Sequence, residues 1–183
     1  IRKEFPQARL IIAPRKPGRI HEITRLAEKY GLSLGLRSSL KAMNNPRPKY
    51  QVVLIDTIGE LGRIYAVGDA VFVGGSLINH GGHNVLEPAA HAKPIIVGPS
   101  MSNFKDSFAL LSKVGACVQI HDGKEMTDMF LKIFKDDALR KKMGDASLQV
   151  IRENRGAAVR TIGYLKELLE ERSGGAITMD IYP

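Results

Sequence analysis

Short apolar runs alternate along most of the chain with segments whose apolar residues recur at helical spacing. The apolar runs that predict β-strands occupy residues 9–13, 32–36, 51–55, 70–73, 94–97 and 116–120. Segments that predict helices separate most of them, at residues 20–30, 61–67, 85–91 and 103–114. Because parallel strands need a crossover between them, this alternation predicts an α/β fold with a parallel sheet flanked by helices.

The pattern changes after residue 120. Three helical stretches follow one another without an intervening strand, at residues 124–135, 137–153 and 157–171. Residues 44–49 are rich in Asn, Pro and basic side chains, which predicts a mobile surface loop. The sequence therefore predicts one domain over residues 1–171 and a tail over residues 172–183. Because the chain starts abruptly at Ile1, we expect a fragment of a larger protein.

The loops that follow four of the predicted strands are unusual in their glycine, cationic and polar content. They are residues 14–19, 56–62, 74–84 and 98–103. Each comes directly after an apolar run, and the carboxyl ends of parallel strands lie at one edge of a sheet. We therefore expect the four loops to form one ligand-binding rim.

The loop at residues 74–84 is the richest of the four, with two Gly-Gly pairs and two histidines. Paired glycines allow positive φ angles and a close approach of the backbone to a ligand, which makes Gly75 and Ser76 candidate contacts. The loop leads into a helix near Asn84, whose free N–H groups would attract phosphate or carboxylate. The alternative is a long turn that needs glycine for its own geometry.

Two charged side chains on the rim are candidates for binding. Arg15 follows Pro14 at a predicted strand end, and its guanidinium suits phosphate or carboxylate. Glu87 has the spacing from Asn84 that lets a carboxylate cap a helix start, but it is equally suited to accept hydrogen bonds from ribose hydroxyls.

The segment Gly59, Glu60 and Leu61 begins another predicted helix, so its N–H groups could face an anion or the edge of a base. A plain helix start with an acidic residue at its positive end explains the segment equally well.

Charge and composition narrow the function classes. The net charge of +8 and the pI near 9.7 favour anionic partners. The basic residues lack interleaved aromatic side chains, which argues against nucleic acid. His80, His83 and His91 have no second ligand cluster at metal spacing, so no metal site is predicted. The one cysteine, Cys117, lies in an apolar run and reads as a buried hydrophobic residue.

Residues 69–106 carry three motifs in order: Gly-Gly-Ser at 74–76, Gly-Gly-His-Asn at 81–84 and Glu-Pro-Ala-Ala-His at 87–91. This stretch closely resembles the donor-binding core of bacterial 3-deoxy-D-manno-octulosonic acid (Kdo) transferases, of glycosyltransferase family 30. The resemblance continues at residues 11–15 and 56–62, and it extends from about residue 5 to about residue 171.

The resemblance implies a GT-B glycosyltransferase with two Rossmann-like domains, of which this chain would be the C-terminal, N-terminally truncated one. Its donor, CMP-Kdo, would be bound by a set of rim residues: Pro14, Arg15, Gly59, Glu60, Leu61, Gly75, Ser76, Asn84, Val85, Leu86 and Glu87. No metal and no cofactor are implied. The family's general base lies in the N-terminal domain, so no catalytic residue is expected here, and the fragment alone should be inactive.

The resemblance also implies partners and a location. The acceptor would be a lipid A precursor, bound mainly by the other domain, in lipopolysaccharide synthesis. The enzyme would sit on an anionic membrane surface, at the cytoplasmic face of the bacterial inner membrane. Two alternatives stay open: a GT-B transferase or epimerase that uses a UDP-sugar, and a non-catalytic anion-binding module.

Overall fold

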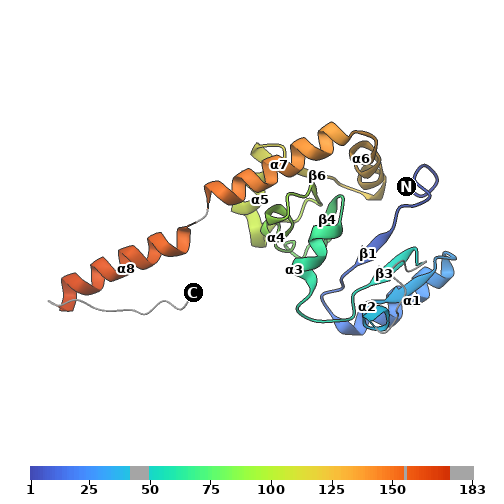
Figure 1. Cartoon of the computed structure of the whole chain (residues 1–183), viewed down its shortest axis with the longest axis horizontal. Coiled ribbons are helices and arrows are strands. Elements are labelled where there is room, and N and C mark those ends of the chain that lie inside the picture. The colour runs from blue at the N-terminus through green and yellow to red at the C-terminus, as the bar shows by residue number, and fades with distance from the viewer. Residues whose placement is uncertain (42–49, 155, 174–183) are drawn as a thin grey trace.

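The chain folds into two parallel β-sheets of three strands each, with helices packed around them (Figure 1). The computed structural model describes residues 1–41, 50–154 and 156–173. The loop predicted at residues 44–49 lies outside these described residues. The alternation of apolar runs and helical segments thus predicts the α/β class correctly.

The first sheet has the strand order β1-β3-β2. Its strands are β1 (Leu10–Ile12), β2 (Leu34–Leu36) and β3 (Val52–Leu54). Both pairs are parallel, with Leu10 and Leu34 each opposite Val52 in register. All three strands are shorter than their apolar runs, because only three residues of each run pair with a neighbour.

The second sheet has the order β4-β5-β6 and is also parallel. Its strands are β4 (Val71–Val73), β5 (Ile95–Val97) and β6 (Cys117–Gln119). The sequence pattern predicts one continuous sheet, whereas the strands form two groups. Among the described residues β1 pairs only with β3 and β4 only with β5, so no hydrogen-bonded strand pair joins the two groups.

The predicted helices are all present. The helical elements in chain order are η1 (Pro17–Arg19), α1 (Ile20–Lys29), α2 (Arg37–Lys41), α3 (Leu61–Ile64), η2 (Tyr65–Val67), α4 (Leu86–Ala90), η3 (Ser102–Phe104), α5 (Lys105–Lys113), α6 (Gly123–Lys135), α7 (Asp137–Glu153) and α8 (Ala157–Ser173). Helix α2 is not predicted by the sequence, because its five residues are too few to show a helical period. Helix α8 extends to Ser173, two residues past the predicted domain boundary, and the rest of the predicted tail lies outside the described residues.

The hydrophobic core surrounds the second sheet. The central strand β5 is fully buried, and two clusters of buried residues lie on either side of it. One cluster packs against α4, α5 and α7, with Leu111 at its centre, and the other packs against α6 with Ile133. Helix α7 approaches the turn before β5 very closely at Gly144, where an added Cβ would lie 2.3 Å from the carbonyl oxygen of Ala92.

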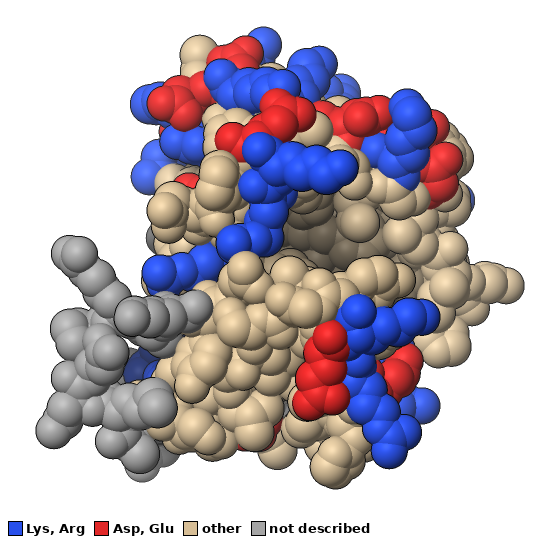
Figure 2. Space-filling view, turned by 90° about the vertical axis from the view of Figure 1, so that its right-hand side faces the viewer, with Lys and Arg blue, Asp and Glu red and all other residues tan. Residues whose placement is uncertain are grey.

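The first sheet is much less covered. Leu10 is 53% exposed and Ile11 is 37% exposed on the edge strand β1. The segment before β1 reaches the second half of the molecule, where Phe5 packs edge-on against Phe134 of α6 and Glu4 pairs with Lys135. Figure 2 shows a hollow between the two halves, with Lys and Arg side chains along one side. Helix α8 leads away from the rest of the fold (Figure 1).

Candidate functional site

The loops that the sequence predicts as one rim follow the carboxyl ends of strands in both sheets. Within each sheet the strands are parallel, so the loops after β1 and β3, and those after β4 and β5, share an edge. Across the two sheets, the charge of Arg15, after β1, lowers the pKa of His83 in the loop after β4. Charges act this way only at short range in water, so the loops after β1 and β4 lie near each other.

The glycine-rich loop after β4 is held in place by hydrogen bonds to its neighbour. The N–H of Gly82 donates to the carbonyl of Gly75 (3.1 Å), which closes the loop on itself. The N–H of Gly81 donates to the Ser100 hydroxyl (3.0 Å), and the side-chain amide of Asn103 donates to the carbonyl of His80 (3.1 Å). All three loop glycines named here have positive φ, as predicted. The rim is therefore preformed.

Ser76 has a structural task within this loop. Its side chain is fully buried. The hydroxyl donates to the carbonyl of Val73 and accepts the N–H of Gly98 (2.8 Å), which ties the end of β4 to the end of β5. Only glycine fits at position 98, because a Cβ there would lie 2.4 Å from the Ser76 carbonyl oxygen. The Ser76 hydroxyl is thus not available to a ligand. A contact between Ser76 and the sugar donor stays a prediction, and it concerns only the backbone atoms of Ser76.

Arg15 is exposed at the rim next to Pro14, and no ion pair or hydrogen bond engages it within the described ranges. The other arginines of the first half are different. Arg19 pairs with Glu22 at 2.8 Å, and Arg37 pairs with Glu60 at 3.3 Å. An unpaired guanidinium beside a preformed glycine loop is suited to bind a phosphate or carboxylate.

Glu60 is one of the predicted contacts, and its carboxylate is already occupied. It accepts hydrogen bonds from Arg37 and from the hydroxyl of Thr57. Its neighbour Gly59 has a φ of 84°, and nothing lies within 4 Å of a Cβ built there, so the backbone at this point of the rim is open. Leu61, also predicted, is 37% exposed at the start of α3.

Asn84 and Glu87 are joined differently from the predicted reciprocal cap. The Asn84 side-chain oxygen accepts the N–H of Leu86 (3.0 Å), and its amide donates to Oε1 of Glu87 (3.1 Å). The residue at the N-cap position is Val85, whose side chain is buried in the core. Asn84 therefore orients Glu87, and no atom of the described chain hydrogen bonds to the second carboxylate oxygen. The charge of Glu87 adds to burial in raising the pKa of Tyr65 to about 12.

His83 is a rim residue that the sequence-based selection of donor contacts omits. Its ring lies on the Gly74–Gly75 turn, where a Cβ on Gly75 would be 3.3 Å from Nε2. Burial, then Arg15, then His80 lower its pKa, so the ring is neutral near pH 7. The sequence signal was the placement of His83 directly after the second glycine pair; the contact with Gly75 depends on loop geometry that the sequence does not display.

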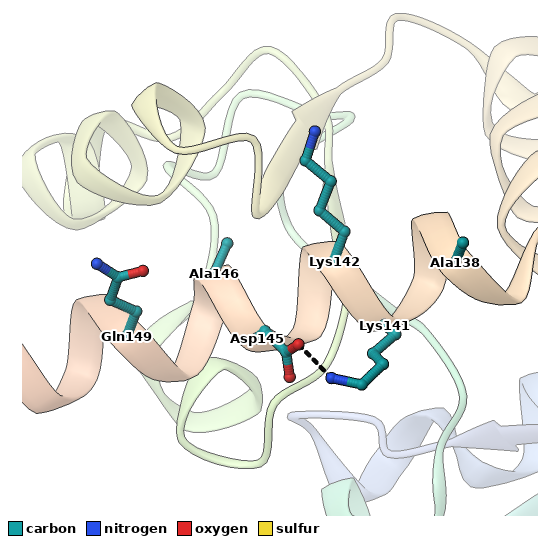
Figure 3. Close-up of a pocket in the computed structure, with 6 residues that line it drawn as sticks. All are labelled: Ala138, Lys141, Lys142, Asp145, Ala146 and Gln149. Atoms are coloured by element: carbon teal, nitrogen blue, oxygen red, sulfur yellow. Dashed lines mark hydrogen bonds and ion pairs between the residues drawn. The ribbon is translucent and has the colours of Figure 1, made fainter.

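Two surface hollows can be compared with this rim. One, of about 500 Å³, is lined only by α7, through Ala138, Lys141, Lys142, Asp145, Ala146 and Gln149 (Figure 3). It is a groove along a single helix, and none of its lining residues comes from the loops at the strand ends. The other, of about 410 Å³, lies between the loops after β4 and β5 and is lined by Leu77, Ile78, Asn79, Pro99, Ser100, Met101 and Ser102. The second hollow therefore belongs to the rim.

Two classes of site are not found in the part of the chain that the structure describes. No group of three or more His, Cys, Asp or Glu side chains is placed to hold a metal ion there. No helix in it is both long and apolar enough to cross a membrane. Cys117 is buried, and burial raises the pKa of its thiol to about 12, as its apolar surroundings predict.

Comparisons with known proteins support these findings. No protein-family model matches the chain. The 3-deoxy-D-manno-octulosonic acid transferase of Haemophilus influenzae is 34% identical over 168 residues, which are 91% of this chain and 39% of that protein. The same transferase of Bordetella pertussis is 33% identical and covers 92% of this chain and 39% of its own length. The chain thus spans about two fifths of these relatives.

Two solved structures have the same fold. The C-terminal CMP-Kdo binding domain of WaaA from Acinetobacter baumannii superposes with a TM-score of 0.74 at 28% identity, over 82% of this chain and 77% of that one. The C-terminal domain of the group 1 glycosyl transferase LpcC from Francisella tularensis superposes with a TM-score of 0.59 at 16% identity, over 84% and 72% of the two chains. The second likeness concerns the fold alone.

Parallel strands with a glycine-rich rim, together with these structures, define the class: the C-terminal domain of a GT-B glycosyltransferase. Within that class the chain is similar over 91–92% of its length to the 3-deoxy-D-manno-octulosonic acid transferases of Haemophilus influenzae and Bordetella pertussis, and it matches the C-terminal part of such transferases.

Proposed function

We propose that this chain is the donor-binding domain of an enzyme that transfers Kdo from CMP-Kdo to a lipid A precursor. The observation that carries the proposal is the unpaired Arg15, whose charge reaches His83 in the preformed glycine-rich loop. Arg15 therefore brings to the rim a positive charge that no ion pair within the described residues neutralises. The solved domain of WaaA that has the same fold is a CMP-Kdo binding domain, and CMP-Kdo is an anionic nucleotide sugar that suits such a rim.

Different rim residues bind different parts of the donor. Arg15, the open backbone at Gly59 and the backbone of the Gly75 turn face the anionic and polar parts of the donor. Glu87, oriented by Asn84, offers its second oxygen to the ribose hydroxyls. Val85 and Leu86 contribute mainly through their backbone, because their side chains pack into or against the core. A bound nucleotide would leave as a monophosphate, and the positive rim would stabilise that charge as it develops.

The proposed enzyme acts at the cytoplasmic face of the bacterial inner membrane, where its lipid acceptor lies. Acceptor binding and the general base belong to the part of the relatives outside this chain. We accordingly expect no transfer of Kdo by the 183-residue chain alone. Turnover of CMP-Kdo to a Kdo-lipid product by this chain would contradict that assignment.

Calorimetric titration of CMP into the chain tests donor binding. CMP should bind more tightly than UMP, and Arg15→Ala should weaken CMP binding by about tenfold or more, since a charge-assisted hydrogen bond is lost. Arg19→Ala is the matched control, because Arg19 lies in the same loop but is paired with Glu22. Equal affinity for CMP and UMP, or equal loss in both variants, would exclude the proposed site.

Glu87→Gln tests the ribose contact separately. The variant should weaken binding of CMP more than binding of 2′-deoxy-CMP. Only CMP has a 2′-hydroxyl that can donate a hydrogen bond to the Glu87 carboxylate. A uniform loss for both nucleotides would show that Glu87 only supports the loop through Asn84.

A further inference from the structure

We infer that His83 binds the donor phosphate together with Arg15 and takes up a proton as the nucleotide binds. The inference rests on the proposed function, because it assigns a second binding group and a protonation change to the same rim. It concerns a residue outside the predicted set of donor contacts.

The position of His83 is fixed by the glycine loop. Its ring lies against the Gly74–Gly75 turn, and Gly75 has a φ of 72° and leaves room for the ring where a side chain would be in close contact with Nε2. The ring is half-buried and stands at the same rim as Arg15. An imidazole placed in this way can direct a nitrogen at a ligand that rests on the turn.

Neither ring nitrogen of His83 has a hydrogen-bond partner among the described residues. His121 makes the contrast clear, since its Nδ1 lies 3.0 Å from the Glu125 carboxylate. His80 lies within 3.3 Å of the Asn79 carbonyl through its own Nδ1. A half-buried polar ring with no protein partner is available for a ligand.

The groups that act on His83 leave it neutral in the free protein. Burial lowers its pKa first, and the charges of Arg15, from the end of β1, and of His80, from the same loop, lower it further. No carboxylate is among the groups that influence it. An incoming phosphate supplies the missing opposite charge, offsets Arg15 and so raises the pKa of His83.

The sign of the linkage follows from these shifts. His83 has a lower pKa in the free chain than in the complex, so protons favour the complex. Nucleotide affinity is therefore highest below the pKa of the free chain and falls as pH rises through the pKa of the complex. The step is a protonation only: the imidazole nitrogen gains one proton from solvent and no covalent bond to the ligand forms.

Nuclear magnetic resonance of the His83 ring proton, titrated with pH in the free chain and with saturating CMP, is the direct test. The His83→Gln spectrum assigns the signal. The midpoint should move to higher pH when CMP is present. In Arg15→Gln the midpoint of the free chain should also move to higher pH, because the cation that lowers it is gone.

A binding series gives an independent readout. The CMP dissociation constant of His83→Gln is divided by that of the unchanged chain at each pH. Protonation of CMP itself affects both constants alike, so it drops out of this ratio. The ratio should be about ten at pH 6 and should approach one at pH 8, since a charge-assisted hydrogen bond is lost only where the imidazole is protonated. His121→Gln is the matched control and should give a ratio near one at both pH values.

The outcomes separate the two proposals. If CMP binds but the His83 midpoint and the pH dependence of the ratio do not change, the role of His83 is wrong and the donor site stands. If CMP does not bind the unchanged chain, both the donor site and the role of His83 are wrong.

Discussion

The two sheets of this molecule have the same strand number and direction but very different surroundings. Strand β5, at the centre of the second sheet, is fully buried between two hydrophobic clusters. In the first sheet only the central strand β3 is largely buried, and the edge residue Leu10 is 53% exposed. The second sheet is thus built to hold its loops rigidly, whereas in the first sheet Arg15 follows a strand that has little packing around it.

This difference maps onto the site. The loops after β4 and β5 are tied together by the buried hydroxyl of Ser76 and by Ser100 and Asn103. In the first half, the loop after β3 is tied to α2 by the exposed polar pair of Ser38 with Asp56. A rigid half that positions the backbone therefore faces a looser half that supplies the cation. Four measurements test this difference between the two halves.

The largest expected effect is in the core of the second half. Leu111→Ala should lower the free energy of unfolding by about 2–5 kcal/mol, because a fully buried side chain is replaced by a cavity. Leu10→Ala in the first half should cost less than about 1 kcal/mol, since the side chain is already half in water. Urea unfolding of the two variants checks this, and equal losses would remove the contrast between the sheets.

Ser76→Ala comes next. The substitution leaves the buried N–H of Gly98 without its acceptor, so the free energy of unfolding should fall by about 1–3 kcal/mol. Ser102→Ala, at an exposed position near the same loop, should change it by no more than about 0.5 kcal/mol. Thermal unfolding compares them; a neutral Ser76→Ala would mean that the two loops do not depend on this hydroxyl.

Amide hydrogen exchange measures the comparison directly. The N–H groups that link β1 and β2 to β3 should exchange about tenfold or more faster than those that link β4 and β6 to β5, which corresponds to about 1.4 kcal/mol. The reason is that few buried contacts oppose opening of the first sheet. Equal protection in both sheets would show that the molecule opens as one unit.

The smallest effect concerns Ser38 and Asp56 in the first half. Hydrogen bonds from the Ser38 hydroxyl and N–H lower the pKa of Asp56. Such a shift stabilises the fold above the unfolded pKa and is lost as pH falls through the folded one. Ser38→Ala should raise the pKa of Asp56 toward its ordinary value and narrow the stability difference between neutral and acid pH. Carboxyl carbon resonances report the pKa; an unchanged titration would contradict the prediction.

Much of this architecture follows from local pattern. The apolar runs ending at Pro14 and before Gly74 predict β1 and β4, and the positive φ values of the loop glycines follow from their pairing. Short elements cannot be predicted from local pattern. Helix α2 is about one turn long, so its apolar residues cannot show a helical period. The split into two sheets depends on which strand edges meet, and that is decided by contacts far apart in sequence.

The site shows the same division. Position after a strand end predicts the placement of Arg15, because the parallel sheet dictates where strand ends go. Glu87 lies in α4, the helix to which the loop after β4 leads. The buried state of Ser76, the pairing of Glu60 with Arg37 and the bond from Asn84 to Glu87 are choices among partners that residue type alone leaves open. They require the three-dimensional packing of one loop on another.

The edge of β1 has a practical consequence for handling this chain. Within the described part of the chain, one edge of β1 has no neighbouring strand, and Leu10 and Ile11 are exposed on it. Such an edge is a template on which other extended segments can pair. Aggregation should therefore appear first in concentrated samples, and Leu10→Lys should reduce it.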